Sequence, residues 1–93
     1  MENVILQEVC KITGVNAGNI QGRRRYARVC NARHFYWWAL YYIGRYSRSH
    51  ISLPVGVGHG TVYHGIRRID DFIDVKDRLI ISWYEAINNE AIE

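Results

Sequence analysis

The sequence predicts one helix of this chain with well-defined ends, at residues 59–74. The segment before it, residues 54–58, contains one proline and two glycines, which interrupt a regular helix. Apolar residues then recur at the spacing of a helical face, at Val62, Ile66, Ile69 and Ile73. That face must pack on the rest of the molecule, while the first turn, residues 59–61, stays small and polar. Gly65 lies beside the apolar face and predicts close approach of a neighbouring backbone.

The rest of the chain also has helical patterns. Gly14 is expected to end the first helix, Asn16 can cap the next one, and Ser47 or Ser49 can cap a later one. Further helices are expected at about residues 3–13, 17–20, 29–46, 48–53 and 76–90. Residues 54–58 are expected to be non-helical, and no alternating strand pattern of any length is present. The sequence therefore predicts one domain over residues 1–93, an all-α compact helical domain of five to six helices.

Positive charge is concentrated in the first half of the chain. Residues 1–50 contain eight Lys and Arg against two acidic residues, whereas residues 51–93 contain four against seven. Five of the arginines fall within eleven residues, at Arg23, Arg24, Arg25, Arg28 and Arg33. Such a cluster is typical of a surface that binds a polyanion, and a solvated loop without a ligand is the alternative.

Composition excludes several classes of protein. No apolar run approaches the roughly 18 residues of a membrane-spanning helix, and the first residues lack the pattern of a secretory signal. Cys10 and Cys30 stand apart without metal-type spacing, so we expect two buried reduced thiols in a cytoplasmic protein. A DNA-bound protein of this kind would associate with the nucleoid.

Several blocks of the sequence resemble the C-terminal DNA-binding domain of the bacterial replication initiator DnaA. The matching blocks are the arginines at 23–25, the segment 29–34, the serine-led segment 47–51 and the segment 59–69, His-Gly-Thr-Val-Tyr-His-Gly-Ile-Arg-Arg-Ile. The resemblance covers about residues 3–75 and leaves the helix at 76–90 as an addition. It implies a helix-turn-helix that binds double-stranded DNA, with the helix from His59 in the major groove and the basic loop in the adjacent minor groove.

Residue roles follow from this resemblance by position. Arg25 matches the family's minor-groove arginine, and Arg23 and Arg33 match basic positions that contact the DNA backbone. His59 and Thr61 match the signature histidine and the second signature threonine. Together with the density of charge, this gives the predicted DNA-binding residues Arg23, Arg24, Arg25, Arg28, Arg33, His59, Thr61 and Arg67.

The chain also departs from the family pattern. Val57 and Gly58 stand where the family has Arg-Asp, and Gly60 stands where it has its first signature threonine. Because glycines cannot supply the bidentate contacts that discriminate bases, we expect an altered sequence preference rather than a loss of DNA binding. No phosphate-binding G-x-x-x-x-G-K-[ST] motif is present, so no nucleotide cofactor is expected.

A run of aromatic residues occupies the segment 34–43. The resemblance implies that the core is faced by Phe35, Tyr36, Ala39, Leu40 and Ile43. The remaining aromatic residues, Trp37, Trp38, Tyr41 and Tyr42, then fall on the other face. An exposed aromatic face predicts a homodimer or another protein partner. The alternative is that the C-terminal helix, with Trp83 and Tyr84, folds back and covers this face.

Evidence for an enzyme is weak. His59 and His64 are five residues apart, on different faces of a helix, and His64 is expected to be partly buried. The aspartates at 70, 71 and 74 are interpreted as a solvated run, and no nucleophile, base and orienting group occur together. We therefore predict no catalytic residues, no metal and no cofactor. The expected function is duplex DNA binding, as a transcription regulator or replication accessory factor. The alternative is a protein interaction module that acts through the aromatic face.

Overall fold

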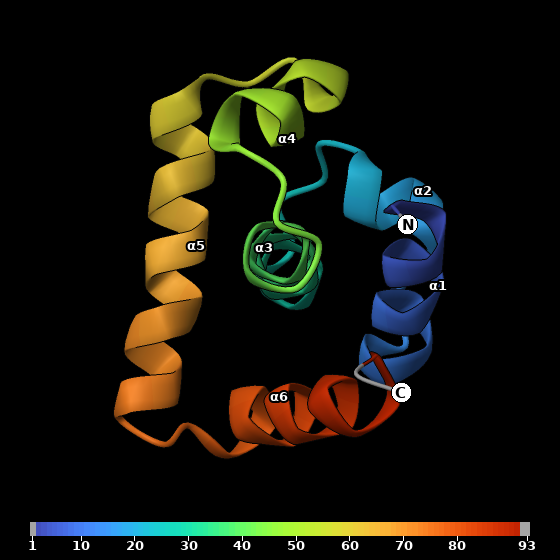
Figure 1. Cartoon of the computed structure of the whole chain (residues 1–93), viewed down its shortest axis with the longest axis vertical. Helices are drawn as coiled ribbons and strands as arrows, with labels where there is room; N and C mark the ends of the chain where they lie inside the picture. Colours follow the sequence, from blue (N-terminus) through green and yellow to red (C-terminus); the bar gives the residue numbers. More distant parts are fainter. Residues whose placement is uncertain (1, 92–93) are drawn as a thin grey trace.

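The computed structural model describes residues 2–91, which form six helices and no strand. The helices are α1 (Glu2–Thr13), α2 (Ala17–Gln21), α3 (Ala27–Tyr42), α4 (Arg48–Val55), α5 (His59–Asp74) and α6 (Arg78–Ala91). Figure 1 shows α3 end-on at the centre, with the other five helices arranged around it. The predicted all-α class is therefore confirmed for the described part of the chain.

The central position of α3 follows from its composition. Its buried residues lie on every side of the helix, as expected for a helix surrounded by others. They are Val29, Ala32, Arg33, Phe35, Tyr36, Trp37, Trp38, Ala39 and Leu40. The ring of Phe35 stacks on that of Trp38 with centroids 5.6 Å apart and lies 5.5 Å from the ring of Trp83 in α6. The aromatic segment is thus the core of the molecule.

Most helix ends lie where capping residues predict them. Gly14 has a φ of +74° directly after α1, in the left-handed region that favours glycine. Asn16 accepts a hydrogen bond from the backbone N of Asn19 at 2.8 Å, and Ser47 accepts one from the backbone N of His50 at 3.1 Å. These contacts confirm the predicted starts of α2 and α4.

Two helix C-termini differ from prediction by more than one residue. Helix α3 ends at Tyr42 rather than near residue 46, because the chain turns at Gly44 and Arg45, whose φ is 62°. Helix α4 continues through Pro54 to Val55, so the expectation that residues 54–58 are entirely non-helical was wrong. Pro54 removes one N–H donor from the last turn, and the helix ends one residue later at Val55, before Gly56, whose φ is 67°.

Helix α5 has the predicted bounds and packs closely on α3. A Cβ placed on Gly65 would lie 2.7 Å from Cε3 of Trp37 and 2.9 Å from Cδ2 of His34. Gly65 therefore permits the close approach of α3 side chains rather than of a backbone. In the described residues, no helix is both long and apolar enough to span a bilayer.

Candidate nucleic-acid interface

A basic loop at residues 22–26 connects α2 to α3, and Arg23, Arg24 and Arg25 are exposed on it. The side chain of Arg33, in α3, fixes the backbone of this loop through hydrogen bonds. Its Nε donates to the carbonyl of Ile20 at 2.9 Å, and its Nη2 donates to the carbonyls of Asn19 at 2.9 Å and Arg24 at 3.0 Å. Arg33 is only 9% exposed. The prediction that Arg33 contacts DNA is therefore corrected, because its guanidinium is used to fix the loop.

Arg28 has a similar structural contact at the other end of the loop. Its Nη2 donates to the carbonyl of Thr13 at 2.9 Å, at the C-terminus of α1. The same atom would lie 3.1 Å from a Cβ on Gly14. Although Arg28 remains exposed, its guanidinium is directed to the end of α1. The dense arginine cluster thus divides into residues that support the loop and residues that lie on its surface.

The basic loop and the start of α5 lie on one surface. A Cβ placed on Gly56, in the turn between α4 and α5, would lie 3.0 Å from Nη2 of Arg23. Arg23, Arg25 and Thr61 also line a common hollow of about 460 Å³, which we name the loop hollow. Its other lining residues are Gly22, Cys30, Arg33, His34, Trp37 and Val57. The arginines of the loop are therefore brought together with the first turn of α5.

The outward face of α5 is set by its buried stripe. Successive residues of an α-helix are about 100° apart around the axis. The buried residues are Val62, Gly65, Ile66 and Ile69. The centre of the opposite face is formed by Gly60, His64, Arg67 and Asp71, all exposed. His64 was expected to be partly buried, and that expectation was wrong because the ring falls opposite the buried stripe.

His59 and Thr61 lie on the two flanks of that outward face. Thr61 faces the loop hollow, whereas Nε2 of His59 is 3.2 Å from Oγ of Ser49 in α4. On the His59 side, the Arg48 guanidinium lies over the ring of Tyr63, 5.1 Å from its centroid. A second hollow of about 390 Å³, which we name the serine hollow, is lined there by Ser47, Arg48, Ser49, His59, Gly60 and Tyr63.

Charge changes sign along α5. Its first turn contains no acidic residue, and Arg67 and Arg68 are exposed in its middle. Nη1 of Arg67 donates to the hydroxyl of Tyr63 at 3.2 Å, which holds the guanidinium along the outward face. The last turns contain the aspartates at 70, 71 and 74. Residues 59–68 of α5 are therefore suited to approach a polyanion, and the helix dipole adds positive potential at their N-terminal end.

Two buried polar atoms lie at the inner side of the loop hollow. Nδ1 of His34 and Nε1 of Trp37 have no hydrogen-bond partner in the part of the chain that the structure describes. Burial lowers the pKa of His34 to about 4, and the charges of Arg68 and Arg33 act in the same direction. His34 is consequently neutral at physiological pH.

The predicted aromatic partner face is not exposed as a whole. Trp37 is 3% exposed beneath α5, and Trp38 is 6% exposed. Nε1 of Trp38 donates to Oδ1 of Asp70 at 2.9 Å, and its ring lies 5.6 Å from that of Tyr84. The proposal that Trp37 and Trp38 form a partner interface is therefore corrected. Helices α5 and α6 cover the two tryptophans together, whereas only α6 was considered as the cover.

Comparisons of the chain with protein-family models, with curated proteins and with solved structures gave no match. The geometry of the surface therefore carries the functional argument.

Sequence reasoning missed two exposed groups of this surface. Arg48 follows the cap of α4 and lies beside the start of α5, and His64 lies at the centre of the outward face. The helical position of His64, four residues after Gly60 and three before Arg67, was a signal that could have identified it. No comparable signal existed for Arg48, because its position depends on how α4 packs against α5.

The described residues contain no group of three or more His, Cys, Asp or Glu that could hold a metal ion. Cys10 and Cys30 are free and half-buried, and burial raises the pKa of the Cys10 thiol.

Proposed function

We propose that this chain binds double-stranded DNA through the N-terminal part of α5 and the basic loop at residues 22–26. The observation that supports it most is that the two segments share one surface. Arg23 of the loop lies against Gly56, just before α5. Arg23, Arg25 and Thr61 line the same hollow. Helices α4 and α5, joined by residues 56–58, would act as a helix-turn-helix, as the resemblance to the DnaA C-terminal domain implies.

The dimensions of α5 suit this role. The major groove of B-DNA is about 12 Å wide and admits one α-helix. With α5 in the groove, Arg24 and Arg25 would lie towards one backbone and Arg48 towards the other, because the basic loop and α4 flank opposite sides of the helix. Arg25 would reach the adjacent minor groove. The acidic C-terminal turns of α5 would remain outside the groove.

Base recognition would come from the middle of α5. Arg67 can bond the acceptor edge of guanine in two places, and His64 and Tyr63 can each contribute one polar contact. Neither Gly58 nor Gly60 has a neighbour within 4 Å of an added Cβ, so the domain itself does not require a glycine at these positions. Their small size would let a DNA backbone approach the start of α5. We infer that the domain recognises its DNA sequence through only a few side chains. It would serve as a regulator of transcription or as an accessory factor of replication.

A salt-dependent mobility shift with a mixed-sequence duplex of about 20 base pairs tests this function. Four phosphate contacts would give a log–log salt slope on the order of −4, and Arg24→Ala with Arg25→Ala would reduce its magnitude by about 2. Lys76→Ala with Arg78→Ala is a matched control, because both residues are exposed cations that follow the C-terminal end of α5. Equal losses in the two double variants, or no binding at low salt, would contradict the proposal.

A further inference from the structure

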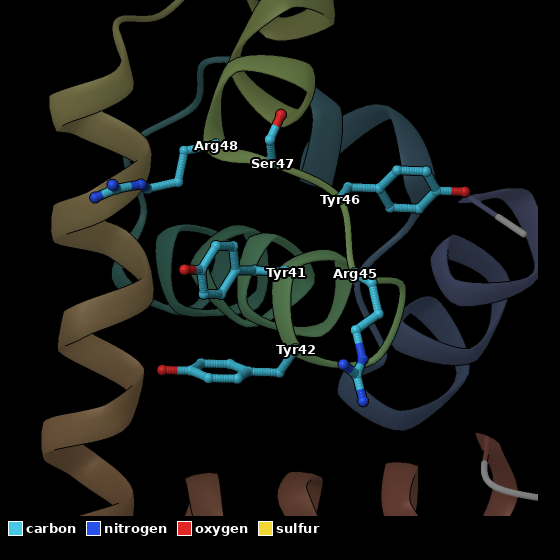
Figure 2. Close-up of a pocket in the computed structure, with 6 residues that line it drawn as sticks. All are labelled: Tyr41, Tyr42, Arg45, Tyr46, Ser47 and Arg48. Atoms are coloured by element: carbon cyan, nitrogen blue, oxygen red, sulfur yellow. The ribbon is translucent and has the colours of Figure 1, made fainter.

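A third hollow lies at the C-terminal end of α3, away from the basic loop, and shares Ser47 and Arg48 with the serine hollow. It has a volume of about 690 Å³ and is lined by Tyr41, Tyr42, Arg45, Tyr46, Ser47 and Arg48. We name it the tyrosine hollow. Figure 2 looks onto it, with Tyr41, Tyr42 and Arg48 extending towards α5, and Arg45 and Tyr46 on the other side of the connecting backbone.

We propose that the tyrosine hollow binds single-stranded nucleic acid, by stacking of unpaired bases on its tyrosine rings and by pairing of phosphates with its arginines. Proteins that bind single strands combine these two features, aromatic rings for the bases and cations for the backbone. The proposal does not depend on duplex binding by α5, and the two can fail separately.

The aromatic half of the site is formed by Tyr41 and Tyr42. Their ring centroids are 5.1 Å apart, and their planes are nearly perpendicular at 86°. Tyr42 is 47% exposed, and its hydroxyl donates to Oδ2 of Asp70 at 2.9 Å. In Figure 2 the ring of Tyr41 turns its face outward, whereas that of Tyr42 is seen edge-on. A ring fixed at its hydroxyl loses little freedom when a base stacks against it, which favours binding.

The charged half of the site favours an anionic occupant. Two of the six lining residues, Arg45 and Arg48, are cationic, and none is acidic. The nearest acid described above, Asp70, already accepts hydrogen bonds from Trp38 and Tyr42. The hollow is wide and open rather than enclosed. These features fit a flexible anionic strand laid across the surface better than a small molecule buried in a cavity.

The backbone of Arg45 fixes where its side chain leaves the chain, at the edge of the tyrosine hollow. Its φ of 62° lies in the left-handed region, which glycine adopts without strain and other residues rarely adopt. A long cationic side chain stands here although glycine would suit the turn better. The turn ends α3, and it is closed by the backbone N–H of Tyr46, which donates to the carbonyl of Leu40 at 3.1 Å. Lys76, in the turn between α5 and α6, has the same feature with a φ of 58° and offers a matched comparison outside the hollow.

Fluorescence anisotropy with a labelled 12-nucleotide oligothymidylate tests the site. Tyr42→Ala should weaken binding about tenfold through loss of one stacking ring, whereas Tyr42→Phe should keep it within about twofold. Arg45→Gly should weaken binding about threefold through loss of one phosphate contact, while Lys76→Gly should not change it. Because both glycine variants relieve the same backbone strain, a loss confined to Arg45→Gly cannot arise from unfolding.

Two further measurements complete the test. An abasic oligonucleotide of equal length keeps its phosphates and should bind at least tenfold more weakly than the oligothymidylate. Tighter binding of oligothymidylate than of oligouridylate would assign single-stranded DNA, and the reverse would assign RNA. Arg24→Ala with Arg25→Ala should lower duplex binding and leave the single strand bound. Equal binding of abasic and thymine strands, or equal losses in Arg45→Gly and Lys76→Gly, would overturn the proposal.

Discussion

The loop hollow has an inner part, which we name its floor, and an outer edge, which we name its rim. Both contain arginines, but these arginines have different roles. The floor comes from α3, where Arg33 and His34 lie against the packed interior. The rim comes from the basic loop and α5, where Arg23 and Arg25 lie on the surface. Arg33 donates to three backbone carbonyls, whereas Arg25 is exposed beside Thr61.

This difference shows that the density of arginine in a sequence does not measure the density of ligand contacts. A guanidinium beneath a loop donates to backbone carbonyls and is used to hold the loop in place. A guanidinium exposed on the loop, such as that of Arg25, lies where a phosphate can reach it. The floor therefore determines where the rim lies, and changes in the two should have different consequences for stability and for binding.

The largest effect should follow from Arg33→Ala. Three carbonyls lose a charged donor, and we expect the free energy of unfolding to fall by about 3 kcal/mol. Urea denaturation followed by tryptophan fluorescence measures this change. Arg24→Ala should alter stability by less than about 0.5 kcal/mol, because Arg24 is exposed. If Arg33→Ala left stability unchanged and abolished duplex binding, Arg33 would belong to the rim instead of the floor.

A smaller change in stability should distinguish the two glycines Gly65 and Gly60 of α5. In Gly65→Ala the new methyl would meet Trp37 at 2.7 Å, and we expect a loss of about 2 kcal/mol. In Gly60→Ala the methyl meets nothing within 4 Å, and the gain in helix propensity should stabilise the domain by about 0.5–1 kcal/mol. Thermal unfolding should give shifts of opposite sign. Two shifts of the same sign would show that the inner and outer faces of α5 are wrongly assigned.

The sequence predicted the helices better than it predicted the roles of their side chains. Helix α5 was placed correctly because its apolar stripe and the glycines before it are local signals. The cap residues Asn16 and Ser47 act within four residues of themselves, so they too were recognisable. Local signals are sufficient where a structure is determined by neighbours in the chain.

Side-chain roles that depend on distant contacts could not be predicted. Arg33 was assigned to DNA because its partners, the carbonyls of Asn19, Ile20 and Arg24, are identified only by how α2 packs on α3. Trp38 was assigned to a partner face because its hydrogen bond to Asp70 spans 32 residues. In both cases a large side chain had two physically reasonable environments, and tertiary packing decided between them.

The smallest loss of stability should be a dependence of stability on pH through His34. Its pKa is lowered to about 4 in the folded protein, first by burial and then by the charges of Arg68 and Arg33. The unfolded chain binds a proton near the ordinary histidine pKa of about 6.5, whereas the folded protein does not until about pH 4. Stability should therefore fall as the pH decreases between these two values. We expect a loss of about 1.5 kcal/mol, after allowance for the partial exposure of the ring.

His34→Gln isolates this contribution, because glutamine keeps a polar side chain and does not titrate. Stability measured at pH 7 and pH 4 should differ less in the variant than in the unaltered protein, and the difference between the two proteins is the contribution of His34. A pH titration of the His34 ring resonance by NMR provides the direct measurement. A midpoint near 6.5 would show that the floor of the loop hollow is open to water, and the contrast between a packed floor and an exposed rim would then be lost.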